Sequence, residues 1–190
     1  SEDVEKTLNE IGFTTERIWD MTRYGTAASI GMYFWFSTGA EDAVLVCDNI
    51  YSVGEEYKQL AASLSLARIY DAPILLTPCD ALSVDAASLI TDLNVSNVVL
   101  VGTNPSENLT SAIESIGPTL TKVAGTSIDK TLDRIIGHIK SKLTELEDIT
   151  TARIVVTEDN YLDILKMPAD ADDTIVFVIS DTSKAKELTD

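Results

Sequence analysis

The stretch ERIWDMTRYGTAASI, residues 16–30, decides the fold because a related stretch, TKVAGTSIDKTLDRI, stands at residues 121–135. Each stretch follows a segment of helical periodicity that ends in Ile-Gly, at Gly12 in the first case and at Gly117 in the second. When the two glycines are aligned, the matching pairs are Ile11 with Ile116, Ile18 with Val123, Thr26 with Thr131, and Ile30 with Ile135. Agreement at one spacing over several elements indicates an internal repeat.

A Val-rich run follows each stretch and extends the match. After a small insertion, DAVLVCDNIY at residues 42–51 aligns with ARIVVTEDNY at residues 152–161. Each unit then consists of a helix, a short strand, a turn, a second helix and a buried strand that ends in acidic residues. We expect a single α/β domain over residues 1–190, with one full unit, about residues 4–108, and one partial unit, about residues 109–190.

Short apolar runs rich in Val, Ile and Leu alternate with helical periodicity along the whole chain. Continuous apolarity in a short run is typical of a parallel strand that is covered on both faces. The sequence therefore predicts an α/β fold, a mostly parallel sheet with helices on both faces, in a flavodoxin-like or Toprim-like three-layer sandwich built from repeated βα units. The expected strands are residues 17–19, 43–47, 73–77, 97–101, 121–124, 153–157 and 174–179.

Two helices and one aromatic run carry further predictions. Asn104 is expected to cap a helix that has Pro105 in its first turn, and Glu107 is expected to complete a capping box. A long helix is expected from about residue 128, with one apolar face formed by Ile128, Leu132, Ile135, Ile139, Leu143 and Leu146. The run YFWF, residues 33–36, cannot all face one way on a helix, so it is either a core helix or a contact with a neighbouring module or subunit.

Composition and charge exclude several classes of protein. The chain is 45% apolar, which is enough for a sizeable core, and its net charge is −17. Like charge repels nucleic acid and anionic lipid, so neither is an expected partner. No apolar run approaches the roughly 18 residues of a membrane span, and none is expected.

Polar and acidic residues follow the predicted strands, at Asp48, Asn49, Asp80, Thr103 and Asn104. Since the carboxyl ends of parallel strands share one edge of the sheet, these residues form a candidate site for a cation or a sugar. The alternative is that they serve the loops, because Asp and Asn are favoured in turns and caps.

Arg23 and Tyr24 mark the strand-to-helix junction of the first unit, where the second unit has Ile128 and Asp129. The pair is therefore not needed to fold every unit. We interpret it first as a structural staple, with Arg23 bonding loop carbonyls or an acid and Tyr24 packing its ring. A contact with a ligand or a neighbour is the second interpretation.

The two cysteines, Cys47 and Cys79, each lie just past a predicted parallel strand. If those strands are neighbours, the pair is a candidate disulfide; otherwise both are separate buried thiols. With one histidine and no Cys-x-x-Cys pair, no metal site is expected.

Residues typical of catalysis are not grouped in a recognisable motif. His138 lies beside the apolar face of the long helix without an evident nucleophile, so a partly buried, hydrogen-bonded histidine is expected. The segment GTNPSENL lacks the Gly-Lys-Ser/Thr ending of a phosphate loop. We predict no catalytic residue and no cofactor.

The order of these segments resembles the cell-wall-binding repeat type 2 family. The matching segments are LNEIG, ERIWDMTRYGTAASI, DAVLVC, DAPILLT and VSNVVLVGTN, within about residues 4–160. The resemblance implies a non-enzymatic, extracellular module of surface-layer or other cell-surface proteins, for attachment to the cell envelope or for its assembly. The implied partners are an envelope polymer, a surface glycan or neighbouring surface-protein modules, with a homo-oligomer as a further alternative.

The charge of the chain is compatible with the implied surface location but not with an anionic ligand. A net charge of −17 is poorly suited to anionic wall polymers, so fold and surface location carry over better than the ligand. The alternative function is a cytoplasmic α/β domain, an enzyme included, that binds a small ligand or a cation through the acidic strand-end loops.

Overall fold

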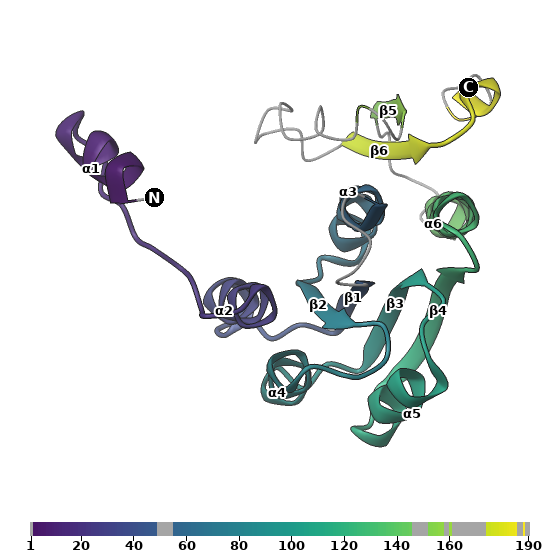
Figure 1. Ribbon diagram of the computed structural model, residues 1–190, viewed down its shortest axis with the longest axis horizontal. Helices are drawn as coiled ribbons and strands as arrows, with labels where there is room; N and C mark the ends of the chain where they lie inside the picture. The colour runs from purple at the N-terminus through teal and green to yellow at the C-terminus, as the bar shows by residue number, and fades with distance from the viewer. Residues whose placement is uncertain are drawn as a thin grey trace.

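The computed structural model describes residues 2–48, 55–145, 152–157, 160, 174–185 and 188. In chain order the elements are α1 (Glu2–Glu10), α2 (Arg23–Trp35), β1 (Asp42–Asp48), α3 (Glu55–Tyr70), β2 (Ile74–Pro78), α4 (Val84–Asp92), β3 (Asn97–Thr103), α5 (Glu107–Ser115), β4 (Thr119–Gly125), α6 (Ile128–Glu145), β5 (Ala152–Thr157), β6 (Thr174–Ile179) and the 3₁₀ turn η2 (Thr182–Lys184). Helix α1 stands apart from the rest of the molecule and is joined to α2 by an extended segment (Figure 1).

The main sheet has four parallel strands in the order β2-β1-β3-β4. In the central strand β1, Leu45 lies between Leu75 of β2 and Leu100 of β3, and all three side chains are fully buried. The order is that of a flavodoxin-like sheet, which confirms the predicted fold class. The continuous apolar runs of β1 and β3 are thus explained by burial on both faces.

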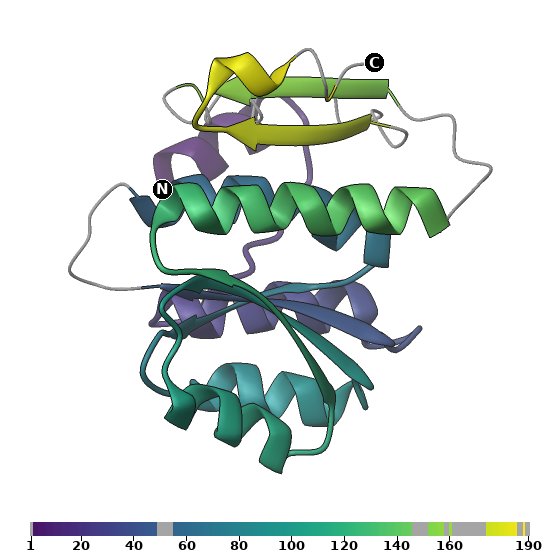
Figure 2. The same cartoon turned by 90° about the vertical axis from the view of Figure 1, so that its right-hand side faces the viewer.

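Helices cover both faces of this sheet (Figure 2). Helices α2, α4 and α5 pack on one face, where Leu89, Leu109 and Ile113 join the core. Helices α3 and α6 pack on the other face, where Leu66 and Ile139 are fully buried. The periodic apolar residues Leu132, Ile135 and Ile139 of α6 face the sheet, as their spacing predicts, whereas Leu64 of α3 is exposed.

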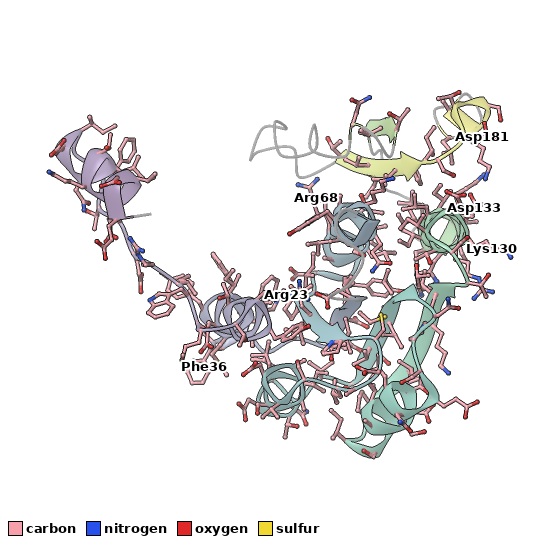
Figure 3. All side chains as sticks on the ribbon, viewed as in Figure 1. Arg23, Phe36, Arg68, Lys130, Asp133 and Asp181 are labelled. Carbon is pink, nitrogen blue, oxygen red and sulfur yellow. The ribbon has the colours of Figure 1, made fainter. Side chains whose placement is uncertain are left out.

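A second, two-stranded parallel sheet of β5 and β6 lies over α3 and α6, on the side away from the main sheet (Figure 2). Ser65 of α3 ties β6 to the helix layer, because its hydroxyl donates to Val176 O at 2.8 Å and accepts from Val176 N at 2.9 Å. Arg68 adds a hydrogen bond from Nη1 to Thr174 O at 2.7 Å. Beyond the other end of β6, Lys184 forms an ion pair with Asp133 of α6. Asp133 lies near Asp181, the residue that caps η2 (Figure 3).

The strand expected at residues 17–19 is wrong. Residues 13–20 belong to no sheet of the described chain, and Trp19 is exposed. The aligned residues of the second unit do form a strand, since β4 pairs with β3 through Val101 and Val123. A strand needs a partner edge, and the first unit presents none to residues 17–19 within the described residues.

Three details of the helices differ from expectation or refine it. Ser106, and not Asn104, caps α5: its hydroxyl accepts from Leu109 N at 3.1 Å, while Asn104 adopts a left-handed φ of 53° in the preceding turn. The long helix begins at Ile128 as predicted, and Leu146 lies outside the described residues. In the aromatic run, Tyr33, Phe34 and Phe36 are exposed, so the run is not a core helix.

Candidate functional site at the carboxyl ends of the strands

The carboxyl ends of β1, β2, β3 and β4 meet at one edge of the sheet, as expected for parallel strands. Asp48, the last residue of β1, lies opposite Pro78, and Cys79 N donates to Asp48 O at 3.0 Å. Asn49 lies outside the described residues. The edge therefore brings the predicted polar residues to one side of the molecule, and their contacts decide which of them can serve a ligand.

Arg23, Tyr24 and Asp48 form one hydrogen-bonded cluster. Arg23 extends from the start of α2 toward the strands (Figure 3), with Nε 3.0 Å from Asp48 Oδ2 and Nη2 3.0 Å from Asp48 Oδ1. The Tyr24 hydroxyl donates to the same Oδ1 at 3.0 Å and accepts from Arg23 Nη2 at 3.2 Å. The Arg23 guanidinium carbon also lies 5.2 Å from the centre of the Tyr24 ring, a cation–π distance.

Burial decides the electrostatics of this cluster. The buried position of Asp48 raises the pKa of its carboxyl above the usual value, although the hydrogen bond from Tyr24 and the charge of Arg23 act in the opposite direction. Burial likewise raises the pKa of Tyr24. Both carboxylate oxygens are engaged by protein groups, so Asp48 serves the fold before it serves any ligand.

The turn before α2 places Arg23 and Tyr24. Thr22 caps the helix, with its hydroxyl accepting from Gly25 N at 2.9 Å, and Thr26 Oγ1 accepts from Asp20 N at 3.0 Å. A side chain at position 25 would lie 2.4 Å from Asp20 Oδ1, so it would displace the Asp20 side chain. These bonds direct the first turn of α2, and with it Arg23, at the end of β1.

The side chains of Thr103 and Asn104 form hydrogen bonds within the protein. The Thr103 hydroxyl lies 3.5 Å from Gln59 Oε1 and 3.2 Å from Thr131 Oγ1, while Asn104 Nδ2 donates to Thr126 O at 3.3 Å. Gln59 also donates to Cys47 O at 2.7 Å. Asp80 lies exposed in the turn after β2.

Sequence reasoning missed Gln59 and Thr131 as members of this edge. Both are buried polar side chains on helices, at positions where the periodicity predicts contact with the sheet. A polar residue at such a position is the signal that could have identified them, because it must find a hydrogen-bond partner when buried.

The strands that carry the two cysteines are neighbours, as the disulfide prediction required, but both cysteines are free thiols in this structure. Cys47 packs against β3, where a side chain at Gly102 would lie 2.2 Å from its Sγ. A hydrogen bond with the Cys79 thiol and burial raise the pKa of the Cys47 thiol. The pair is therefore a buried, unreactive thiol beside a half-buried one.

His138 and the acidic side chains form no further constellation among the described residues. His138 Nε2 lies 2.8 Å from the Tyr70 hydroxyl, and the two rings stack, so this histidine has a hydrogen-bond partner as predicted. Within the described ranges, no three His, Cys, Asp or Glu side chains are grouped to hold a metal ion. None of the described helices has the length and apolar character to cross a membrane.

An apolar groove with a volume of about 760 Å³ lies on the opposite side of β2 from β1, between α2 and α3. Ala27, Ile30 and Phe34 of α2 line one wall, and Leu60 and Leu64 of α3 line the other. Since β2 is an edge strand, the groove leaves the border of the main sheet open.

No family model matches the chain. The chain is 32% identical over 115 residues to PH0614, an uncharacterized protein of Pyrococcus horikoshii, and the match covers 60% of this chain and 32% of that protein. It is 31% identical over 124 residues to the N-acetylmuramoyl-L-alanine amidase LytC of Bacillus subtilis, covering 64% of this chain and 23% of the amidase. The chain thus spans a third or less of the length of these relatives.

Two solved structures have the same fold. Cwp8 from Clostridium difficile superposes with a TM-score of 0.68 and 22% identity, over 97% of this chain and 32% of Cwp8. Cwp6 from the same organism superposes with a TM-score of 0.66 and 21% identity, over 88% of this chain and 27% of Cwp6. The parallel α/β arrangement described above is therefore similar to a part of each of these longer proteins.

Proposed function

We propose that this chain is a module of a cell-surface protein, and that it acts without catalysis in attachment to the cell envelope or in its assembly. The observation that carries the proposal is the match of nearly the whole chain to about a third of Cwp8, together with a match to a smaller part of the amidase LytC. Both relatives are cell-wall-associated proteins. A segment that recurs within longer proteins of different kinds behaves as a module, and its activity must be argued from its own surface.

The strand-end cluster supports a role without bond-breaking chemistry. The carboxylate of Asp48 is held by Arg23 and Tyr24, and the hydroxyl of Thr103 is directed at Gln59 and Thr131. To act as an acid or base toward a substrate, Asp48 would have to give up a contact with Arg23 or Tyr24, because both of its oxygens are occupied. The cluster therefore favours a scaffold whose outer surface makes the contacts.

The charge of the chain selects among the candidate ligands. With a net charge of −17, the module repels an anionic polymer, so we favour a neutral surface glycan or a neighbouring surface-protein module. Attachment to an anionic polymer would need divalent cations between the two surfaces.

Co-sedimentation with purified Bacillus subtilis cell walls tests the proposal. We expect the chain to pellet with walls from which acid has removed the anionic polymers, and to pellet less with untreated walls at low ionic strength. An unrelated protein of similar size and net charge is the control for trapping. Recovery of all the protein in the supernatant, with either wall preparation and with or without calcium, would contradict attachment, and release of soluble wall fragments would contradict a non-enzymatic role.

A further inference from the structure

The chain before β1 carries an unusual amount of exposed apolar surface. It comprises α1, the extended residues 13–20 and the outer face of α2, which we call the N-terminal surface. Its exposed apolar side chains are Val4, Leu8, Ile11, Phe13, Trp19, Ile30 and Phe34. In Figure 1, α1 stands away from the sheet and its helices, and no residue of α1 is buried. Apolar surface gathered in this way marks an interaction site.

The second unit of the repeat shows what covers such a surface. There the same three segments are α5, β4 and α6, and all of them are packed on the first unit. Helix α5 buries Leu109 and Ile113 against the main sheet, β4 pairs in parallel with β3, and α6 buries its apolar face against the sheet and α3. The opening segments of one unit therefore complete the sheet of the unit before it.

Four exposed apolar positions of the N-terminal surface align with apolar residues of the second unit that are buried. The exposed fractions are 58% for Val4 against 0% for Leu109, 36% for Leu8 against 0% for Ile113, 41% for Ile30 against 1% for Ile135, and 61% for Phe34 against 0% for Ile139. These four exposed positions thus have buried counterparts in the second unit, whereas Ile11 and its counterpart Ile116 are both exposed.

The two junctions also share backbone features. Helix α1 is followed by Gly12 with a φ of 97°, and α5 is followed by Gly117 with a φ of 113°. Thr26 Oγ1 accepts from Asp20 N at 3.0 Å, and its counterpart Thr131 accepts from Gly125 N at 3.1 Å. The extended segment therefore enters α2 in the geometry in which β4 enters α6.

The roles of the glycines at these junctions are exchanged between the units. In the first unit the side chain of Asp20 fills the space over Gly25. In the second unit Gly125 occupies the place of Asp20, and a side chain there would lie 2.5 Å from Thr131 N and 2.9 Å from the Cβ of Lys130. Each junction therefore has a glycine on one side of this contact and a larger residue on the other.

A hydrogen bond in the second unit has an acceptor that the first unit lacks among its described contacts. The Thr131 hydroxyl, on α6, lies 3.1 Å from Gly102 O of β3, to which it can donate across the sheet edge. Its counterpart Thr26 has only the nearby Asp20 O, at 3.3 Å, as acceptor among its described contacts. A β3-type strand beside residues 14–20 would supply the carbonyl that Thr131 has and Thr26 lacks.

We propose that the N-terminal surface docks on another repeat unit of this kind, and that residues 14–20 add to its β3-type strand as a parallel edge strand. In this arrangement α1 covers one face of that unit's sheet, as α5 does here, and the outer face of α2 covers the other, as α6 does. The apolar groove beside Ile30 and Phe34 then borders the docked unit. The occupant must lack a β4 of its own, whereas β3 of this chain is already paired with β4. The docking does not depend on binding to the cell wall.

A tandem protein tests this inference. Residues 22–106 are placed directly before residues 2–190, so that the upstream Ser106 replaces Ser1 at the junction and the upstream unit has no β4 of its own. Hydrogen exchange is measured for the amides of residues 14–20 in this tandem protein and in the 190-residue chain. We expect these amides to exchange without protection in the chain alone, and roughly 100-fold more slowly in the tandem protein, close to the protection of residues 119–125.

Substitution Ile18→Asp is the matched control. It should leave the melting temperature of the 190-residue chain unchanged, because Ile18 has no strand partner there, and it should abolish the added protection in the tandem protein. Unprotected residues 14–20 beside a folded upstream unit would overturn the inference, and so would an upstream unit that circular dichroism shows to be unfolded. Protection in the 190-residue chain that grows with its concentration would assign the surface to a second copy, against the inference.

Discussion

The guanidinium of Arg23 holds the carboxylate of Asp48 through two contacts of 3.0 Å, from Nε to Oδ2 and from Nη2 to Oδ1. Arg23 belongs to the first turn of α2 and Asp48 ends β1, so the contact ties the start of a helix to the edge of the sheet. The Asp48 side chain is 7% exposed and that of Arg23 is 43% exposed. The buried acid therefore depends on Arg23 and Tyr24 to offset the loss of its hydration.

Substitution Arg23→Ala should lower the free energy of unfolding by about 1–3 kcal/mol at neutral pH, because it leaves a buried carboxylate short of donors. The charge of Arg23 lowers the pKa of Asp48, so the variant has an even higher Asp48 pKa than the parent chain. An acid whose pKa is higher in the folded than in the unfolded state stabilises the fold at pH values below its unfolded-state pKa. This stabilisation is lost as the pH rises through its folded-state pKa. The difference between variant and parent should thus be small in acid and widen as Asp48 ionises. Urea unfolding at several pH values measures it.

The double substitution Arg23→Ala with Asp48→Asn is the control for this prediction. The amide removes the unpaired charge, so the double variant should recover part of the stability that Arg23→Ala loses at neutral pH. An unchanged melting temperature for Arg23→Ala would show that the pair is not a structural staple, and would favour a ligand contact for Arg23.

Substitution Thr131→Val should destabilise the chain by about 1–3 kcal/mol, because Gly125 N loses its buried acceptor. The matched substitution is Thr26→Val at the other junction, where the surrounding backbone is exposed. It should cost less than about 0.5 kcal/mol in the 190-residue chain, since water can satisfy Asp20 N. Thermal unfolding of the two variants gives the comparison, and equal losses would contradict the difference in packing between the units.

Substitution Gly102→Ala should destabilise the main sheet by about 1–3 kcal/mol, because the added carbon would lie 2.2 Å from Cys47 Sγ. Replacing Cys47 by Ala removes that sulfur, so the double variant should be more stable than Gly102→Ala alone. A double-mutant cycle from urea unfolding measures the coupling. Additive losses from the two substitutions would show that the close contact is relieved elsewhere.

Alkylation under native conditions should distinguish the two cysteines. Cys79 is half-buried, whereas Cys47 is fully buried and its pKa is raised, so iodoacetamide at pH 8 should label Cys79 and spare Cys47. The variant Cys79→Ser should take up no label in the folded state. In a separate sample that is unfolded without reductant before alkylation, the parent chain should take up two labels. No label, with a mass lower by two hydrogen atoms, would instead indicate a disulfide.

Much of the fold could be predicted because its signals are local. The Val-rich runs predicted the strands from β1 to β6, and the spacing of Leu132, Ile135 and Ile139 predicted the buried face of α6. The helix cap was placed two residues early, at Asn104 in place of Ser106, because both residue types cap helices and only the backbone angles separate them. The position of the candidate site at an edge of the sheet was predicted. Its hydrogen bonds were not, because Asp48 and Thr103 have partners on helices that are far away in the sequence.

The sequence alone predicted the repeat, and it determined the parallel α/β class and the positions of most helices and strands, because apolar spacing and turn residues act within a few residues of one another. Only the tertiary structure decided that Arg23 binds Asp48 and that Thr131 reaches β3. It also decided that residues 119–125 form a strand while the aligned residues 14–20 do not. The reason is that ion pairs and strands require a partner brought close by the fold, and two segments with the same local pattern differ when only one of them has that partner.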